Sequence, residues 1–347
     1  MPKSTRLCEY SGVLHVHSTY SDGSGTVAEI VSAAQAAGLD YLILTDHNGL
    51  QAKAGGWDGW HGSLLVSVGE EVSSRHGHCL ALGTATHVYH KQPLRNILQD
   101  IAAQKGLSFV AHPHGVYRPF LKLRDHSWKD WEVSEFTGLE IWSYMFDWAR
   151  DLKYHRFLRH YRAPDDRIKG PLAQTLSTWD RLCQQQRVVG IGGVDAHARR
   201  YPVLPFVVFP YSDLFQTIRT HVLVPEAFRR EPYEDTQTLL NSLANGRCFA
   251  AYDRLADGTG TRFGSADGSL HMGDEAEFVS PVDMLFEVPT EADLTVIGDG
   301  DVLAQAVGRQ LVVTADRPGV YRAEARIGHR PWIFTNPIYL RHRAGVR

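Results

Sequence analysis

The sequence predicts an α/β protein in which a parallel sheet or barrel is followed by a small β-domain. From Val13 to about residue 200, short apolar runs alternate with helical patterns, which is the order of βαβ units. From about Asp253 the helical periodicity disappears, and Gly-rich turns separate short alternating strands, as in a small β-sandwich. We therefore expect two domains, 1–253 and 254–347.

The first βαβ unit is the clearest. Residues 13–17 predict a strand whose two histidines, His15 and His17, share one face while Leu14 and Val16 share the other. A Ser-Asp-Gly-Ser-Gly turn follows, and a capping box from Thr26 to Glu29 opens a helix that stops at Gly38. The next strand is expected at 41–44, directly before Thr45-Asp46-His47.

Later units repeat this plan. Strands are expected at 64–68, 108–110, 139–141, 188–194 and 248–252, and helices are expected around the apolar stripes that begin at Leu94, Leu172 and Leu239. Polar residues repeatedly follow the strands. Because active sites of barrels and open α/β sheets are built at the carboxyl ends of strands, this edge is the expected site.

One segment, 142–161, mixes aromatic and basic side chains. An amphipathic helix with an aromatic buried face and a basic solvated face would give this pattern, and so would a substrate lid. Aromatic residues among cations can also stack and neutralise nucleotides. We favour the helix.

Composition restricts the functional classes. The chain has 347 residues, 43% of them hydrophobic, and a formal net charge of -3, so no global positive field favours nucleic acid or an anionic membrane. Its four cysteines lie far apart without a CxxC pair, which favours a reducing compartment over a disulfide framework. No apolar leader and no stretch of membrane-spanning length is evident, so we expect a soluble, cytoplasmic protein.

The 18 histidines are the unusual feature, because several cluster with carboxylates after predicted strands. So many imidazole and carboxylate groups at one sheet edge would be costly to bury without cations among them. We expect two or three divalent ions, and a bridging carboxylate could bring two ions within about 3.5–4 Å. The expected ligands are His15, His17, Asp22, His47, Glu71, His78, His112, Asp195 and His197.

Several neighbouring residues have competing interpretations. Asp46 is expected to orient a neighbour by a hydrogen bond rather than to bind metal, and Glu70 to face solvent or form a salt bridge. His114 could contact substrate or donate a proton, or be an ordinary loop histidine. Glu140 could face the barrel interior as a site residue or be a paired buried carboxylate. Three arginines follow the site motifs, namely Arg118, Arg199 and Arg200. Each could bind a phosphate group with two hydrogen bonds, or could be an ordinary solvated surface residue.

The ordered motifs resemble those of the PHP (polymerase and histidinol phosphatase) superfamily across residues 13–197. They are His15-x-His17-Ser18, Ser21-Asp22-Gly23, Thr45-Asp46-His47, Gly69-x-Glu71, Gly77-His78, His112-Pro113 and Asp195-Ala196-His197. The resemblance implies a distorted (β/α)7 TIM-like barrel with a trinuclear centre. Asp22 stands where some members have histidine, and the β-rich tail around 331–339 is similar to that of a subgroup resembling carbaryl (carbamate) hydrolases.

The resemblance also implies how the ligands divide among three ions. His15 and His17 would hold one ion with Glu71 and Asp195, and Glu71 would reach a second ion held by His78 and His112. Asp22, His47 and His197 would hold the third. Carboxylate and imidazole donors suit Mn, Fe or Zn alike.

These observations together predict a metal-dependent hydrolase. The first expectation is a phosphoesterase that uses a metal-bridging hydroxide on a small anionic phosphate ester or nucleotide, with His114, Arg199 and Glu140 as further catalytic candidates. The alternative is a carbamate, ester or amide hydrolase with the same metal centre. A non-catalytic barrel that binds metal or a partner ranks last, because the full donor set is present. Nothing in the sequence fixes an oligomeric state.

Overall fold

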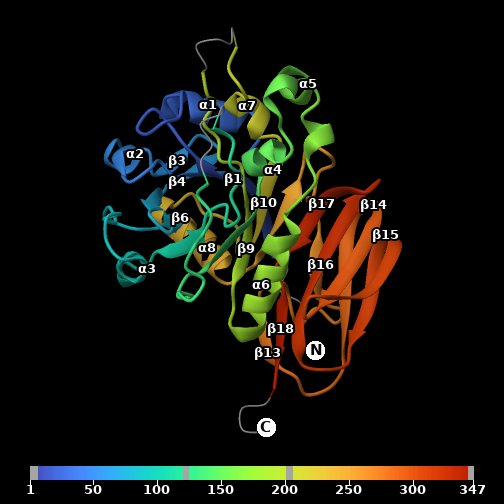
Figure 1. The fold of residues 1–347 in the computed structure, drawn as a ribbon. Coiled ribbons are helices and arrows are strands. Elements are labelled where there is room, and N and C mark those ends of the chain that lie inside the picture. Colours follow the sequence, from blue (N-terminus) through green and yellow to red (C-terminus); the bar gives the residue numbers. More distant parts are fainter. Residues whose placement is uncertain (1–6, 120–124, 201–205, 343–347) are drawn as a thin grey trace.

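The computed structural model describes residues 7–119, 125–200 and 206–342 and shows an α/β protein with extensive β-sheet (Figure 1). The strands are β1 (Cys8–Val16), β2 (Tyr41–Leu44), β3 (Gly59–His61), β4 (Leu64–Val68), β5 (Glu70–Ser74), β6 (Gly77–Leu82), β7 (Leu107–Val110), β8 (Gly138–Ser143), β9 (Val189–Gly193), β10 (Ile218–Val224), β11 (Cys248–Tyr252), β12 (Arg262–Ser265), β13 (Glu275–Glu277), β14 (Val282–Gly298), β15 (Asp301–Ala315), β16 (Gly319–Ile327), β17 (Arg330–Thr335) and β18 (Ile338–Arg341).

The helices lie mainly between the strands of the first part of the chain. They are α1 (Val27–Ala36), α2 (Gln51–Ala54), α3 (Leu94–Ala103), α4 (Tyr144–Ala149), α5 (Phe157–Arg162), α6 (Ala173–Gln185), α7 (Tyr211–Leu214) and α8 (Pro232–Ala244), with short 3-10 turns η2 (Tyr154–Arg156) and η3 (Asp165–Arg167). The predicted capping box is present, because Thr26 and Glu29 bond reciprocally at the start of α1. No helix in the described ranges is both long and apolar enough to span a membrane.

Two sheets build the part of the fold that carries the site. In one, β10, β1, β2 and β4 are neighbours, and β1, β2 and β4 run parallel. In the other, the order is β5-β6-β7-β8-β9, with β7, β8 and β9 parallel. Isolated bridges join the sheets at two places, between His47 and Glu71 and between Val16 and Ala196. Strands of both sheets contribute to one buried apolar cluster, which includes Leu14, Ile43, Leu80, Phe109 and Ile191.

The C-terminal strands β12 to β18 form a second hydrophobic core but remain connected to the first part of the chain. Strand β17 pairs with β11, so the ladder crosses the predicted boundary at residue 253. The buried Arg322 on β16 binds both carboxylate oxygens of Asp180 on α6, at 2.6 and 2.9 Å. Figure 1 shows these strands, in orange and red, flanking α6. The division at residue 253 itself stays a prediction.

One sequence expectation about the fold was wrong. The segment 142–161 is not one helix, because β8 continues to Ser143 and is followed by α4, η2 and α5. Helix α5 returns to α4, where His160 Nε2 lies 2.7 Å from the carbonyl oxygen of Trp148.

Of the two alternatives for Glu70, the structure confirms the salt bridge. Glu70 is fully buried, with its carboxylate 2.7 Å from both His87 Nδ1 and the backbone nitrogen of Val88.

Candidate metal centre

The two histidines of the first strand point into the same site through a local irregularity rather than through plain alternation. His15 has a φ of 67°, and the pairing of β1 with β2 shifts register between Leu14 and Val16. Leu14 and Val16 consequently belong to different apolar clusters, so the expectation that they share a face is wrong. A β-bulge re-aims side chains in this way, and here both imidazoles become fully buried against the same carboxylates.

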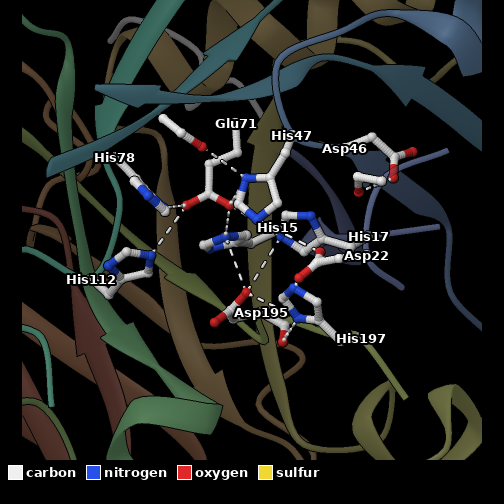
Figure 2. A network of polar contacts seen from close by, with 12 residues as sticks. His15, His17, Asp22, Asp46, His47, Glu71, His78, His112, Asp195 and His197 are labelled. Atoms are coloured by element: carbon white, nitrogen blue, oxygen red, sulfur yellow. Dashed lines mark hydrogen bonds and ion pairs between the residues drawn. The ribbon is translucent and has the colours of Figure 1, made fainter. Parts of the chain in front are cut away.

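Glu71 is the hub of the site (Figure 2). It lies within β5, which Gly69 separates from β4. Its Oε2 is 3.2 Å from the Nε2 atoms of both His15 and His17 and 3.3 Å from His47 Nδ1. Its Oε1 faces the other side, where its contacts are His78 Nδ1 at 2.7 Å and His112 Nε2 at 3.1 Å. One carboxylate thus faces two separate groups of imidazoles.

A second carboxylate completes the buried part of the site. Asp195 Oδ1 lies 3.4 Å from the Nε2 atoms of His15 and His17 and 3.4 Å from His197 Nδ1. Asp22, in the turn after β1, is nearer to solvent and has its Oδ1 2.9 Å from His197 Nε2 and 3.6 Å from His47 Nε2.

Among the residues that the structure describes, three groups have donor atoms within 4.8 Å of one another and could each hold an ion. They are His15, His17, Glu71 and Asp195; then His47, Glu71 and His78; and finally His17, Asp22, His47 and His197. The first group contains the four residues that the resemblance assigns to one ion. The third group contains the three residues that the resemblance assigns to the third ion, together with His17. The second group departs from the expected division, since it has His47 in place of His112, which contacts Glu71 without belonging to a group.

The buried nitrogen atoms fit a cation. His15 Nε2, both ring nitrogens of His17, and His197 Nε2 are buried without a geometrically formed hydrogen bond, although carboxylate oxygens lie within 3.4 Å of most of them. Ligand atoms that converge on one cation lie close together in this way without bonding directly to each other. Such buried polar atoms are costly unless a ligand satisfies them.

The electrostatics of the cluster also demand positive charge. Burial alone would lower the pKa of His17, but the carboxylates of Asp195 and Glu71 outweigh it and raise this pKa to about 9. Burial opposes ionisation of Glu71, yet the charges of His78 and His15 hold its pKa well below the usual range. Burial lowers the pKa of His47 to about 4. The carboxylates thus remain ionised and attract either protons or metal ions to the imidazoles.

Residues around the cluster hold the imidazoles and their loops in place. Glu140 Oε1 is 2.9 Å from His15 Nδ1, and its Oε2 accepts a hydrogen bond from the backbone nitrogen of His112. Ser73 Oγ lies 3.1 Å from His47 Nδ1. Asp46, as expected, is a support: it accepts hydrogen bonds from Ser18 and Ser21 in the loop after β1. Partners of this kind fix the tautomer and orientation of metal-binding histidines.

The backbone is strained at several of these residues. Besides His15, φ is 29° at His112 and 50° at Asp195, in the left-handed region that side chains with a Cβ atom rarely adopt. Non-glycine residues in such conformations concentrate at functional sites, because the surrounding structure must stabilise them.

A cavity of about 410 Å³ opens next to the cluster, which is within the range of small-molecule sites. Of the further catalytic candidates, Arg199 lines this cavity and binds Asp22 Oδ2 at 2.6 Å. His114 lies outside it, bonded to Thr175 Oγ1 and stacked on Trp131. Arg118 instead bonds to the carbonyl oxygen of Arg150.

Sequence reasoning missed His126. Its ring lines the cavity and lies 4.0 Å, centroid to centroid, from that of His78. No strand or motif places it there. His78, its neighbour in the cluster, lies within β6.

One protein-family model matches a segment of the chain. Residues 14–110 match the family model described as PHP domain. No match was found among curated proteins. The matched segment includes His15, His17, Asp22, His47, Glu71 and His78, whereas His112, Asp195 and His197 lie beyond it.

Three solved structures are similar to this chain at low identity. A two-domain protein from Bacteroides vulgatus containing a predicted PHP-like metal-dependent phosphoesterase has 14% identity and a TM-score of 0.46, with 95% of each chain covered. A candidate metal-dependent phosphoesterase from Bifidobacterium adolescentis has 12% identity and a TM-score of 0.37, covering 57% of this chain and 92% of the other. An amidohydrolase from Chromobacterium violaceum, with bound sulfate and no metal, has 17% identity and a TM-score of 0.33, covering 57% and 90%. At these scores, none of the likenesses assigns an activity to this chain.

Proposed function

The chain carries a PHP domain, and from this premise we propose that it is a metal-dependent hydrolase that cleaves small phosphate esters. The observation that carries the proposal is the Glu71 carboxylate, whose two oxygens face imidazoles on opposite sides. A bridging carboxylate of this kind is what a hydrolytic pair of ions requires. In this proposal the strands that surround the cluster, drawn from both sheets, form a distorted (β/α)7 barrel whose carboxyl edge holds the cluster.

Nine residues are proposed as ligands, as in the sequence analysis, for two or three ions of Mn, Fe or Zn. The proposed set is His15, His17, Asp22, His47, Glu71, His78, His112, Asp195 and His197. When bound, such ions lower the pKa of water and stabilise negative charge on phosphoryl oxygens. The reaction adds water to phosphorus and breaks the P–O bond to the alcohol, which leaves with a proton as inorganic phosphate forms.

The protein side chains position this chemistry. In the proposed tautomer, Glu140 Oε1 accepts a hydrogen bond from the Nδ1–H of His15, which leaves the Nε2 lone pair of that ring for the centre. We therefore propose Glu140 as a positioning residue rather than a catalytic one. His114 has no role in this proposal, since its ring lies outside the cavity. Arg199 holds Asp22 at the cavity wall and remains the candidate for contact with the phosphoryl group.

A second candidate function, hydrolysis of a carbamate, ester or amide, has one specific observation in its favour. Arg199 is the only arginine of the described residues that lines the cavity, and it is engaged by Asp22 at 2.6 Å. A phosphate dianion gains from an unengaged guanidinium, whereas a neutral carbonyl does not need one. Aryl phosphates and aryl carbamates with the same leaving group therefore separate the two candidates.

The experiment compares p-nitrophenyl phosphate, p-nitrophenyl N-methylcarbamate and p-nitrophenyl acetate with protein loaded with Mn, Fe or Zn. The proposal expects turnover of the phosphate, and its loss in His17→Ala and Asp195→Asn. The matched control is His342→Ala, which removes an exposed histidine far from the cluster in sequence. Turnover of the carbamate or acetate but not of the phosphate would replace the first candidate by the second. Activity that survives both site variants would mean that the assigned centre is wrong.

A further inference from the structure

The cavity beside the metal centre has two chemically different sides. One side includes the proposed ligands other than His15 and His17, together with Ser73, His126 and Arg199. The other side, which we term the apolar wall, consists of Met145, Phe146, Trp148, Val208, Phe209 and Leu214. None of the residues of the apolar wall plays a part in the proposed hydrolysis, so the wall needs its own explanation.

The apolar wall begins directly beside the metal centre. The ring of Phe146, on α4, stacks on the imidazole of His112 with centroids 4.3 Å apart and an interplanar angle of 20°. Trp148, at the end of the same helix, meets Phe209 edge to face at 4.8 Å. A substrate whose reacting group lies on the ligand side therefore extends its other end along aromatic side chains.

One feature distinguishes the apolar wall from ordinary core packing. Phe209 has a φ of 52°, a conformation that is a genuine outlier for a bulky side chain and that must be stabilised by its surroundings. Backbone strain of this kind beside a cavity indicates a surface formed for a ligand.

From these observations we infer that the substrate is a phosphate monoester with an apolar leaving group of about the size of one aromatic ring. The inference rests on the proposed phosphoesterase function and adds the substrate class. A sugar or glycerol group against this wall would lose its hydration without gaining hydrogen bonds, whereas an aromatic group gains from leaving water. The apolar wall is thus the specificity determinant, and the ligand side is the reaction centre.

The test measures binding first, because binding does not depend on turnover. Calorimetry with the metal-loaded full chain compares benzylphosphonate with 2-hydroxyethylphosphonate, two non-hydrolysable probes that share the charged group. We expect benzylphosphonate to bind at least about tenfold more tightly, since a few buried carbon atoms already give that ratio. Equal affinities, or tighter binding of the hydroxyethyl probe, would overturn the inference.

Variants then assign the preference to the apolar wall. The double substitution Met145→Gln and Val208→Thr keeps side-chain volume while adding polar atoms, and we expect it to reduce the preference to about threefold or less. The matched control, Leu158→Gln with Val312→Thr, makes the same kind of change at two exposed positions outside the cavity. An unchanged preference in the wall variant, with its thermal unfolding still cooperative, would also contradict the assignment.

Turnover separates this inference from the proposed function. Benzyl phosphate and glycerol 3-phosphate both release alkoxides, so their kcat/KM ratio reports recognition more than leaving-group chemistry. We expect a ratio of about ten or more in favour of benzyl phosphate. If neither ester is cleaved while benzylphosphonate still binds preferentially, the phosphoesterase proposal fails and the wall assignment stands. If both are cleaved at equal kcat/KM, the phosphoesterase stands and the wall assignment fails.

Discussion

The carboxylate of Glu140 lies 2.9 Å from Nδ1 of His15, so the opposite nitrogen of that ring is left to face Glu71 and Asp195. Both residues are fully buried or nearly so. A carboxylate behind a metal-binding histidine raises its basicity and fixes its tautomer. The relationship joins β8 to β1 and predicts a measurable effect on metal affinity.

Substituting Glu140 should weaken metal binding without removing any ligand. We expect Glu140→Ala to lower the affinity for Mn or Zn by roughly 10–100-fold, the usual effect of losing such a partner. Glu140→Gln, which can still accept a hydrogen bond, should retain part of the metal affinity that Glu140→Ala loses. Competition with a chromophoric chelator measures both values. Wild-type affinity in Glu140→Ala would show that this carboxylate does not position His15.

Gly193, at the end of β9, is required for that same contact. A Cβ atom at this position would lie 2.1 Å from Glu140 Oε1 and 3.1 Å from His15 Cβ. Gly193→Ala should therefore displace Glu140, reduce metal affinity in the same direction as Glu140→Ala, and destabilise the fold by about 1–3 kcal/mol. The control for chelator competition and urea unfolding is Gly55→Ala. This glycine is exposed, and the Cβ atom added there would lie 3.2 Å or more from its neighbours. Unchanged metal affinity in Gly193→Ala would contradict the packing described.

The C-terminal strands should matter for stability and not for metal binding. All described residues that line the cavity fall between Asp22 and Leu214. Arg322→Met removes the cation that the buried carboxylates of Asp180 and Glu324 share, which should lower the free energy of unfolding by about 3–5 kcal/mol. Arg330→Ala removes an exposed pair with Asp166 and should cost less than about 1 kcal/mol. Urea unfolding measures the stability of both variants, and metal analysis measures their metal content. Loss of metal from folded Arg322→Met would show that the C-terminal strands do affect metal binding.

Alkaline pH should destabilise the fold through His221. Burial would lower the pKa of this histidine, but hydrogen bonds with Asp253 and Glu9 outweigh burial and raise the pKa to about 9. The protonated form is thus favoured in the folded state. Its contribution to the free energy of unfolding is complete below the unfolded pKa of about 6.5 and is lost as pH rises through about 9.

The unfolding free energy should therefore fall by roughly 3 kcal/mol between pH 6.5 and 9.5 because of this group. His221→Gln, whose side chain does not titrate, should lack this part of the decrease. Chemical unfolding of both proteins across that range tests the linkage. Parallel pH profiles would mean that His221 is not charged in the folded protein.

Much of the fold followed from local pattern. The strands 41–44, 64–68 and 248–252 have the bounds that their apolar runs predict, and the α/β class is confirmed. Pairing between distant strands could not be predicted. Strand β10, which lies antiparallel beside β1, carries no motif, and its place depends on contacts between residues more than two hundred positions apart.

The candidate site was predictable where ligands follow strands in motif order. The structure gathers His15, His17, Glu71 and Asp195 into one group, although the role of each as a ligand stays a prediction. The bulge at His15 was not predictable, because alternation assumes a regular strand. His126 was missed because it comes from a loop, and loop positions depend on packing rather than on periodicity.

The most direct test of the central claim is the number of metal ions per chain in the purified protein, measured by elemental analysis before and after chelation. The three donor groups predict two to three ions of Mn, Fe or Zn per chain, removed by a chelator together with phosphoesterase activity and restored with it on metal return. A protein without bound metal, which also gains no activity when these metals are added, would contradict the account and favour a non-catalytic binding protein.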